Sequence, residues 1–391
     1  MAAHHCLFPF DKAVAFPAQK LFNLIFNLII ISIFCHPAFA QDLWNRLYVT
    51  NFGSNSVSVV DLNASRVIAE IPVGLGPTGM AVTPDLEHIY VANYYSGGVS
   101  VISTASNSVE RTIPIPSSYG RSAPFGMAIT PDGSQLFVSN PSDGTIRVIS
   151  TLTNTVTATI TAAYDWALRY IALSPDGQYL YALGYGDGKI SVIRVFNFSL
   201  VTTIRNLPAA RHVAITPDGS RLYVTSDKFN RLYVINATNY SLIYTFQFPT
   251  GSGTITVDIE PSGKFALVSN YQGKVTKIDT DPRSPTYHQI LAEVPQFSGY
   301  QYCIVISPDA RFAYLSNQSD RGRSPNSIDI IDIASGSPTC NTIISSIPVG
   351  KQPWGVAIVK QRPPLPNPSD RCLTPYCEAK IFRRIPRLLG R

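Results

Sequence analysis

The sequence contains little charge and few histidines. Asp, Glu, Lys and Arg make up 14% of its 391 residues, compared with roughly 25% in an average soluble protein. Beyond residue 40 the only histidines are His88, His212 and His288. Copper and haem sites need several converging ligands such as imidazoles, and covalent haem needs a CxxCH segment, which does not occur. The sequence therefore predicts neither a metal site nor a cofactor.

Motifs of nucleophilic and phosphate-binding sites are absent as well. No G-x-S-x-G segment is present to place a serine on a strand-to-helix turn. The Gly-rich segment "GYGDGK" at 184–189 is followed by a strand pattern instead of a helix. It therefore predicts a hairpin turn rather than a phosphate loop, and no motif indicates a catalytic residue.

An apolar run near the N-terminus is typical of an export signal. Leu21 to Phe34 forms this run, two lysines precede it, and Ala38-Phe39-Ala40 follows it as a small-x-small cleavage signal. The run is too short for a comfortable membrane span. We predict a signal peptide over residues 1–40 and an exported protein that is periplasmic, cell-surface or secreted. An uncleaved signal anchor is the alternative.

The positive charge of the chain is concentrated in its tail. Of the formal net charge of +6, residues 361–391 carry +5 and residues 1–40 carry +1, so residues 41–360 are neutral. The segment "RPPLPNPSD" predicts an extended Pro-rich linker, and "EAKIFRRIPRLLGR" is basic and apolar. We predict that this tail contacts a membrane surface or nucleic acid, with a flexible solubilising end as the alternative.

A pattern of four short strands recurs seven times. The unit begins with an apolar strand and a Pro-Asp turn, such as "GMAVTPD", and continues with strands such as "LYVTN", "VSVVD" and "RVIAEIPVG". Pro presets the turn, Asp caps it and Gly takes a positive φ. The second strands begin at residues 47, 89, 136, 180, 222, 266 and 313. This spacing predicts the blades of a β-propeller.

The two ends of the repeat region predict a closed ring. The region begins with a second-type strand at Leu47 and ends with a first-type strand at Trp354 to Val359. We predict an all-β, seven-bladed propeller over residues 41–360, with four antiparallel strands per blade. The C-terminal strand then joins the N-terminal blade and closes the ring. An open solenoid, the alternative, would leave both terminal faces bare.

The "LYVTN", "NSVSVVD" and "PTGMAVTPD" segments resemble the YVTN-repeat family of seven-bladed β-propellers, over about residues 45–360. The resemblance implies an exported or surface protein, and some members bind nucleic acid. Related propellers include lactonases, a lyase and redox enzymes with copper or other cofactors. The resemblance therefore implies a fold rather than one activity, and it weakens in the "LYALG", "LYVTS" and "TVDIEPS" segments.

One face of the predicted propeller is rich in aromatic and basic residues. Loops from fourth to first strands and from second to third strands share this face, which bears the channel mouth. Aromatic rings interleaved with Arg and Lys suit stacking and anion contact. We predict that the face binds an anionic polymer (single-stranded nucleic acid, an acidic glycan or an acidic peptide) or a protein partner, with ordinary loop packing as the alternative. The candidate residues are Phe125, Arg169, Tyr170, Arg211, His212, Tyr302 and Trp354.

Two arginines carry most of this prediction. Arg169 and Arg211 occupy equivalent positions in adjacent units. Neighbouring guanidiniums repel each other unless an acidic group lies near them. Asp165 is one candidate for that group, and otherwise an anionic ligand is expected.

Asp258 and Glu260 provide the alternative of an enzyme. They stand on the first strand of the sixth unit, where the other units have Ala or Val and Thr or Ser. Two acids near a propeller axis could bind a cation or act as a general base. With His212 they would form a lactonase- or lyase-type site, unless Asp258 simply bonds to strand ends or channel water. We favour a monomeric, non-catalytic binding or scaffold protein.

Four cysteines remain after residue 40. Cys303 begins a first strand and Cys340 a fourth strand, so we expect them to be too far apart for the roughly 4.4–6.8 Å Cα separation of a disulfide. We predict that Cys372 pairs with Cys377, or that one of them pairs with Cys340. Metal binding by Cys372 and Cys377 is the alternative.

Overall fold

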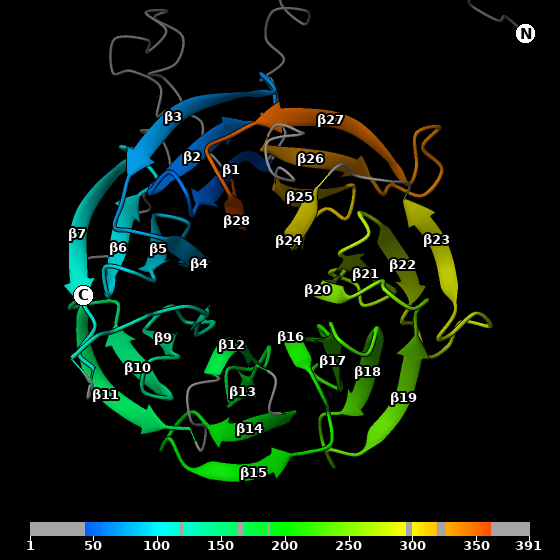
Figure 1. Cartoon of the computed structure of the whole chain (residues 1–391), viewed down its shortest axis with the longest axis horizontal. Helices are drawn as coiled ribbons and strands as arrows, with labels where there is room; N and C mark the ends of the chain where they lie inside the picture. The colour runs from blue at the N-terminus through cyan, green and yellow to red at the C-terminus, as the bar shows by residue number, and fades with distance from the viewer. Residues whose placement is uncertain are drawn as a thin grey trace, which may run out of the picture. The chain divides into compact units, whose positions relative to one another are not determined.

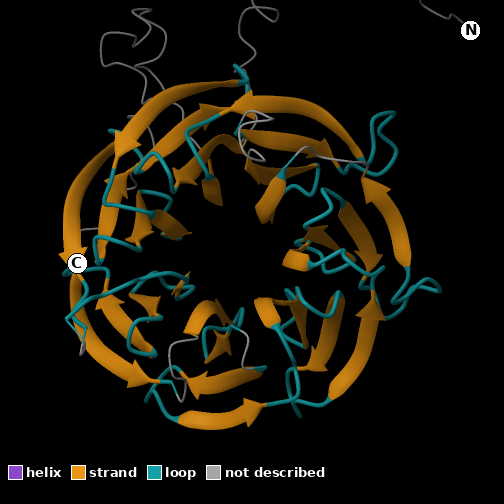
Figure 2. Cartoon of the chain, in the orientation of Figure 1, coloured by secondary structure: helices purple, strands orange, loops and turns teal. Residues whose placement is uncertain are grey.

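Seven four-stranded antiparallel sheets surround a central axis in the computed structural model (Figure 1). The structure describes residues 44–117, 120–162, 168–185, 188–294, 299–318 and 326–360. Within these ranges every regular element is a β-strand (Figure 2). The same ranges contain no helix of a length and hydropathy that would cross a membrane. The predicted all-β, seven-bladed propeller is confirmed.

Each blade runs outward from the axis in the order first to fourth strand. Blade 1 comprises β28 (Pro353–Lys360), β1 (Trp44–Asn51), β2 (Ser56–Asp61) and β3 (Arg66–Pro72); blade 2 comprises β4 (Pro77–Val82), β5 (His88–Asn93), β6 (Gly98–Ser103) and β7 (Ser108–Pro114); blade 3 comprises β8 (Met127–Ile129), β9 (Gln135–Asn140), β10 (Thr145–Ser150) and β11 (Thr155–Thr161); blade 4 comprises β12 (Leu168–Leu173), β13 (Tyr179–Gly184), β14 (Lys189–Arg194) and β15 (Leu200–Ile204). Blade 5 comprises β16 (Ala210–Ile215), β17 (Arg221–Ser226), β18 (Arg231–Asn236) and β19 (Leu242–Gln247); blade 6 comprises β20 (Thr254–Ile259), β21 (Phe265–Asn270), β22 (Val275–Asp279) and β23 (Ile290–Val294); blade 7 comprises β24 (Tyr300–Ile306), β25 (Phe312–Gln318), β26 (Ser327–Asp332) and β27 (Thr342–Pro348).

The C-terminal strand closes the ring as predicted. β28 pairs with β1 in an antiparallel register that places Val356 opposite Val49 and Ala357 opposite Tyr48. Blade 1 is therefore assembled from both ends of the propeller chain, and its first strand comes from the last repeat.

The hydrophobic core is divided among the interfaces between neighbouring blades. Seven clusters of buried side chains each join two adjacent blades. Tyr48 and Val57 of blade 1, for example, pack with Ile89 and Val91 of blade 2. A central strand must therefore be apolar on both of its faces, which explains why the repeats do not alternate between apolar and polar residues.

The tyrosine of the "LYVTN" pattern also carries a polar contact between blades. The hydroxyl of Tyr48 donates to Oδ1 of Asn107, 2.6 Å away in the outer turn of blade 2. Tyr90 donates in the same way to Asn154 of blade 3, also at 2.6 Å. Both Asn residues have positive φ angles, 51° and 53°, which Asn tolerates better than most residues. The repeat thus pairs a buried ring with an acceptor in the next blade.

Candidate functional site

Side-chain hydroxyls of the second strands hold the backbone of residues at the channel mouth. The hydroxyl of Ser139 in blade 3 donates to the carbonyl of Arg169 in blade 4, at 2.6 Å. Ser316 of blade 7 donates to the carbonyl of Trp354 in blade 1, at 2.9 Å. The Ser side chain at the Thr position of the "YVTN" pattern therefore holds the backbone of the next blade at the point where that blade's first strand lies at the channel.

A cavity of about 150 Å³ lies in the channel, where the first strands begin. Five of the seven predicted binding residues line it: Phe125, Tyr170, His212, Tyr302 and Trp354. Its other walls come from the first strands of the blades or from the residue just before them: Gly79, Met80, Gly126, Met127, Ile171, Thr256, Cys303, Gly355 and Val356. Arg169 and Arg211 are not among the lining residues.

The aromatic rings at the cavity form one connected group. The ring centroid of Trp354 lies 4.4 Å from that of Tyr302 and 5.8 Å from that of Phe125. Phe125 lies 5.3 Å from Tyr170, which lies 4.9 Å from His212. Phe125 meets Trp354 and Tyr170 edge to face, at 89° and 86°, a favourable geometry for ring pairs. These rings therefore pack on one another, as the loop-packing alternative expects, and at the same time line the cavity.

Glycines keep part of the cavity wall free of side chains. A Cβ atom on Gly126 would lie 2.3 Å from the carbonyl oxygen of Arg169, and one on Gly355 would lie 2.7 Å from that of Thr78. Contacts this short are essentially never tolerated, so the close approach of neighbouring blades requires glycine there. Backbone therefore faces the channel in these blades, beside the rings of Trp354 and Phe125.

The cavity wall is uncharged at neutral pH. Burial, together with the neighbouring Arg211, lowers the pKa of His212 to about 4. Burial raises the pKa of the Cys303 thiol to about 12, and it also raises the pKa of Tyr170 and of Tyr302. The imidazole is therefore neutral, and the thiol and both phenols keep their protons.

Arg211 has an acidic partner that the sequence analysis did not identify. Its Nη1 lies 3.1 Å from Oδ2 of Asp227, and both side chains are buried. The same Nη1 donates to the hydroxyl of Tyr271, and Tyr185 donates to the same carboxylate oxygen at 3.1 Å. The charge of Arg211 is compensated within the fold and does not require an anionic ligand, which corrects that part of the prediction. Asp165 lies outside the described residues.

Arg169 is held differently. Its guanidinium carbon lies 4.6 Å from the ring centroid of Tyr185 and 5.4 Å from that of Phe125, which are cation–π distances. Within the described ranges no carboxylate forms an ion pair with it. Its side chain is partly exposed, so Arg169 presents a charge beside the cavity.

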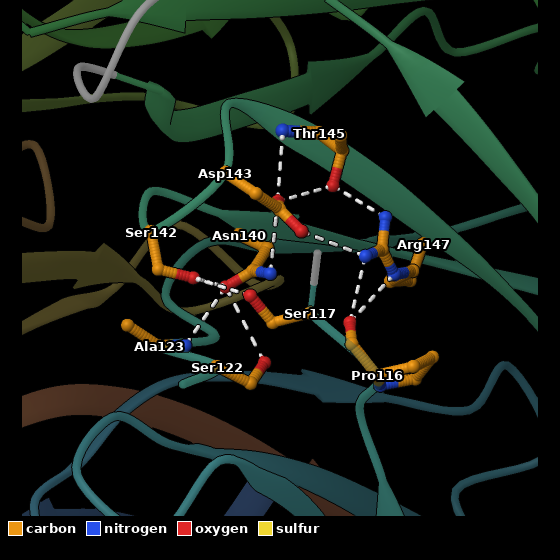
Figure 3. A network of polar contacts seen from close by, with 9 residues as sticks. All are labelled: Pro116, Ser117, Ser122, Ala123, Asn140, Ser142, Asp143, Thr145 and Arg147. Carbon is orange, nitrogen blue, oxygen red and sulfur yellow. Dashed lines mark hydrogen bonds and ion pairs between the residues drawn. The ribbon is translucent and has the colours of Figure 1, made fainter. Parts of the chain in front are cut away.

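A buried polar network holds the loop that leads to Phe125 (Figure 3). Arg147 pairs with Asp143 at 2.8 Å and donates through Nε and Nη2 to the carbonyl of Pro116, at 3.1 and 2.7 Å. Oδ1 of Asn140 accepts a hydrogen bond from the backbone N–H two residues before Phe125, at 2.8 Å. These contacts connect the loop to the second and third strands of blade 3 and set the backbone from which Phe125 projects.

The two acids of blade 6 have separate structural roles. Asp258 accepts hydrogen bonds from the N–H of Ile306 in blade 7, at 2.7 Å, and of Ile259, at 2.9 Å. Burial raises its pKa to about 6 in spite of these two donors. Glu260 lies beyond the end of β20 in the turn to β21, where Ser262 donates to it at 2.6 Å. In most other turns a Thr or Ser donates to an Asp two residues later, so hydroxyl and carboxylate have exchanged places in blade 6.

These roles count against the axial pair as an enzyme site. Neither Asp258 nor Glu260 lines the cavity that contains His212, and Glu260 is not on the first strand as predicted. Among the residues that the structure describes, no group of three or more His, Cys, Asp and Glu side chains could hold a metal ion.

The cysteines are placed far apart in the described part of blade 7. Cys303 lies on β24 and lines the cavity, whereas Cys340 precedes β27, the outermost strand. Both are free thiols, so the predicted alternative in which Cys340 pairs with Cys372 or Cys377 is not seen in the described part of the chain. Cys372 and Cys377 lie outside the described residues, as do residues 1–40 and 361–391, so the disulfide, the signal peptide and the tail contacts stay predictions.

Sequence reasoning did not single out three residues of this site. Met80 and Met127 follow the glycines of blades 2 and 3 and line the cavity, although the repeat alone suggests ordinary core positions. Asp227 stands just after the "LYVTS" strand, where other repeats have uncharged residues such as Phe52, Tyr94 and Tyr271. That departure from the repeat was the available signal for the partner of Arg211.

Comparison with known proteins supports the fold alone. No protein-family model and no curated protein matches the chain. A solved structure of Kuenenia stuttgartiensis hydrazine synthase is similar with a TM-score of 0.64 and 22% identity, covering 74% of this chain and 93% of that chain. A functionally unknown protein from Desulfotomaculum acetoxidans is similar with a TM-score of 0.66 and 16% identity, covering 81% of this chain and 100% of that chain.

Proposed function

We propose that this protein is a non-catalytic β-propeller binding module whose channel mouth receives an anionic ligand. The observation that carries the proposal is the position of Arg169. Its cation lies over the rings of Tyr185 and Phe125 beside an uncharged, aromatic-lined cavity, and no described carboxylate pairs with it. A partly desolvated cation without an ion-pair partner favours an anion from solution.

The charge balance of the described loops on this face supports the same proposal. Arg121, Lys228 and Lys351 are exposed there. The acids Asp227 and Asp143 are engaged in buried ion pairs with arginines. Although residues 41–360 are neutral as a whole, the described part of this face presents more positive than negative charge. Single-stranded nucleic acid, an acidic glycan or an acidic peptide, free or on a protein partner, fits such a surface.

The family, the localisation and the tail contacts of this module are proposed as the sequence predicts them. The YVTN-type repeats and the leader over residues 1–40 support a monomeric member of that family, exported to the periplasm, the cell surface or the medium. The propeller then acts as the binding domain, and the basic tail over residues 361–391 provides a second contact with a membrane surface or nucleic acid. The proposed function does not include catalysis, because Asp258 and Glu260 of blade 6 accept hydrogen bonds from a backbone N–H and from a turn hydroxyl.

The test uses the full chain and its Arg169→Ala variant. Binding of labelled single-stranded DNA, an acidic glycan and an acidic peptide is measured by fluorescence anisotropy over a series of salt concentrations. We expect the affinity for at least one probe to fall as salt rises, and Arg169→Ala to weaken binding and flatten the salt slope by about one unit. Arg194→Ala is the matched control, since Arg194 also lies over a ring, 5.6 Å from the centroid of Tyr179, but at the opposite ends of the strands. Equal binding by all three proteins would contradict the proposal.

A further inference from the structure

The size of the cavity limits what can enter it. Its volume is about 150 Å³, and an apolar cavity of about 150 Å³ in another protein holds one benzene molecule. One six-membered ring therefore fits, whereas a disaccharide or two stacked bases do not. The part of a ligand that enters the channel is a single end group.

The chemistry of the wall indicates what kind of end group this is. Phe125, Tyr170, Tyr302 and Trp354 line the space, together with Met80 and Met127, which also pack against the clusters between blades. Aromatic edges and thioether sulfurs make favourable contacts with a planar π-system. A charged group would lose its hydration there without gaining an ion-pair partner, so the ring that enters is uncharged.

Arg169 indicates where the charge of the ligand lies. Its guanidinium is 5.4 Å from the ring centroid of Phe125, and Phe125 lines the cavity, while Arg169 does not. The anionic group is therefore attached within a few bonds of the buried ring and stays outside the cavity. The repeating backbone of a polymer would not place a ring inside the channel at every residue.

We propose that the cavity binds one uncharged planar ring whose attached carboxylate or phosphate is held by Arg169. This inference rests on the proposed function and narrows it to a ligand class: a nucleotide at a chain end or free in solution, or an aromatic acid. Both sources share one chemistry, a neutral ring beside an anion.

The test separates the ring from the anion, using the full chain and calorimetric titration. Uridine 5′-monophosphate and benzoate carry both a planar ring and an anionic group. Uridine lacks the anionic group, and ribose 5-phosphate and polyphosphate lack the planar ring. We expect uridine 5′-monophosphate, benzoate or both to bind at least about tenfold more tightly than the other probes, with one site per chain. Arg169→Ala should remove most of that advantage and leave the affinity for uridine unchanged.

A second measurement reports on the cavity without any substitution. Cys303 lines the cavity and Cys340 lies at the outermost strand of the same blade. Because the buried Cys303 thiol keeps its proton, it reacts slowly with a small neutral thiol reagent, and the reaction is followed over a long time course by peptide mass mapping. A bound ring should slow the modification of Cys303 further and leave the rate at Cys340 unchanged. The Thr256→Phe substitution fills the cavity and should abolish binding of the ring compounds. If this variant melts like the parent, the loss of binding places the ring in the cavity.

Three results would overturn the inference in different ways. If ribose 5-phosphate and polyphosphate bind as tightly as the ring compounds and depend on Arg169, the ring inference is wrong while the anion-binding function stands. If no anionic probe of either kind binds, the inference and the proposed function both fail. Binding of ring compounds without protection of Cys303 places the ring elsewhere and also overturns the inference.

Discussion

The guanidinium of Arg211 lies 3.1 Å from the carboxylate of Asp227 inside blade 5. The equivalent residue of blade 4, Arg169, instead lies over two aromatic rings and forms no ion pair with a described residue. Two arginines at the same position of adjacent repeats therefore have different roles: one stabilises the fold, and the other presents its charge at the channel mouth.

This difference predicts opposite effects of two alanine substitutions on stability. Arg211→Ala leaves the buried Asp227 carboxylate without its cation and should lower the free energy of unfolding by about 3–5 kcal/mol. Arg169→Ala should change it by less than about 1 kcal/mol. Chemical denaturation measures both. Adding Asp227→Ala should recover part of the loss in Arg211→Ala, and an additive double variant would show that the pair is not coupled.

The tyrosines of the repeats allow a matched test of the contacts between blades. Tyr48→Phe and Tyr90→Phe each remove a hydrogen bond to an Asn of the next blade and should cost about 0.5–1.5 kcal/mol. Tyr223→Phe should be neutral or slightly stabilising, because the buried Tyr223 hydroxyl has no partner among the described residues. Stability is measured by urea denaturation. Equal losses in all three variants would mean that the hydroxyl contacts do not stabilise the packing of neighbouring blades.

Closure of the ring by β28 can be tested by truncation. A chain that ends at Gln352 lacks β28, so the edge of β1 is left unpaired and Val356 and Val359 are lost from the two apolar clusters on either side of blade 1. We expect a loss of several kcal/mol at about 25 cal/mol per Å² of apolar surface, with faster proteolysis of blade 1. A chain that ends at Gln361 is the control, since it lacks the tail but keeps β28. If both truncated chains unfold alike, β28 does not contribute to closure.

Two buried groups predict a pH dependence of stability that two variants would reveal. His212 has a folded-state pKa of about 4, below its ordinary value of 6.5, so its contribution is complete above pH 6.5 and is lost as the pH falls towards 4. Asp258 has a folded-state pKa of about 6, above its ordinary 3.8, so its contribution is complete below pH 3.8 and is lost as the pH rises through 6.

The two contributions oppose each other between about pH 4 and pH 6 in the parent protein. In Asp258→Asn the stability should rise with pH across this window, because only the His212 contribution remains. In His212→Gln it should fall, because only the Asp258 contribution remains. Thermal melting at half-unit pH steps measures both slopes, and slopes of the same sign in the two variants would contradict the assignment.

The fold followed from the sequence to the level of individual strands. The Pro-Asp turns and the recurring "LYVTN" segments are local signals, and a first-type strand at the end of the region implied that Trp354 to Val359 joins Leu47 to complete a blade. The equivalent positions in the repeats also placed Phe125, Tyr302 and Trp354 at one level of the channel, and the structure brings all three to the same cavity. Repeats specify such levels because each blade repeats the same backbone geometry.

Only the tertiary structure decided which of these arginines pairs with a described carboxylate and where a cavity lies in the channel. The repeat gives Arg169 and Arg211 the same position, but Asp227 and Tyr271 approach Arg211 from a loop of its own blade and from the next blade. The strand of Glu260 ends one residue before it, so its carboxylate turns to Ser262 instead of the channel. Repeat positions follow from local backbone geometry. Ion pairing and cavity volume depend on side chains from several blades meeting in three dimensions, so a departure from the repeat such as Asp227 marks an unusual position in the sequence but does not identify its partner.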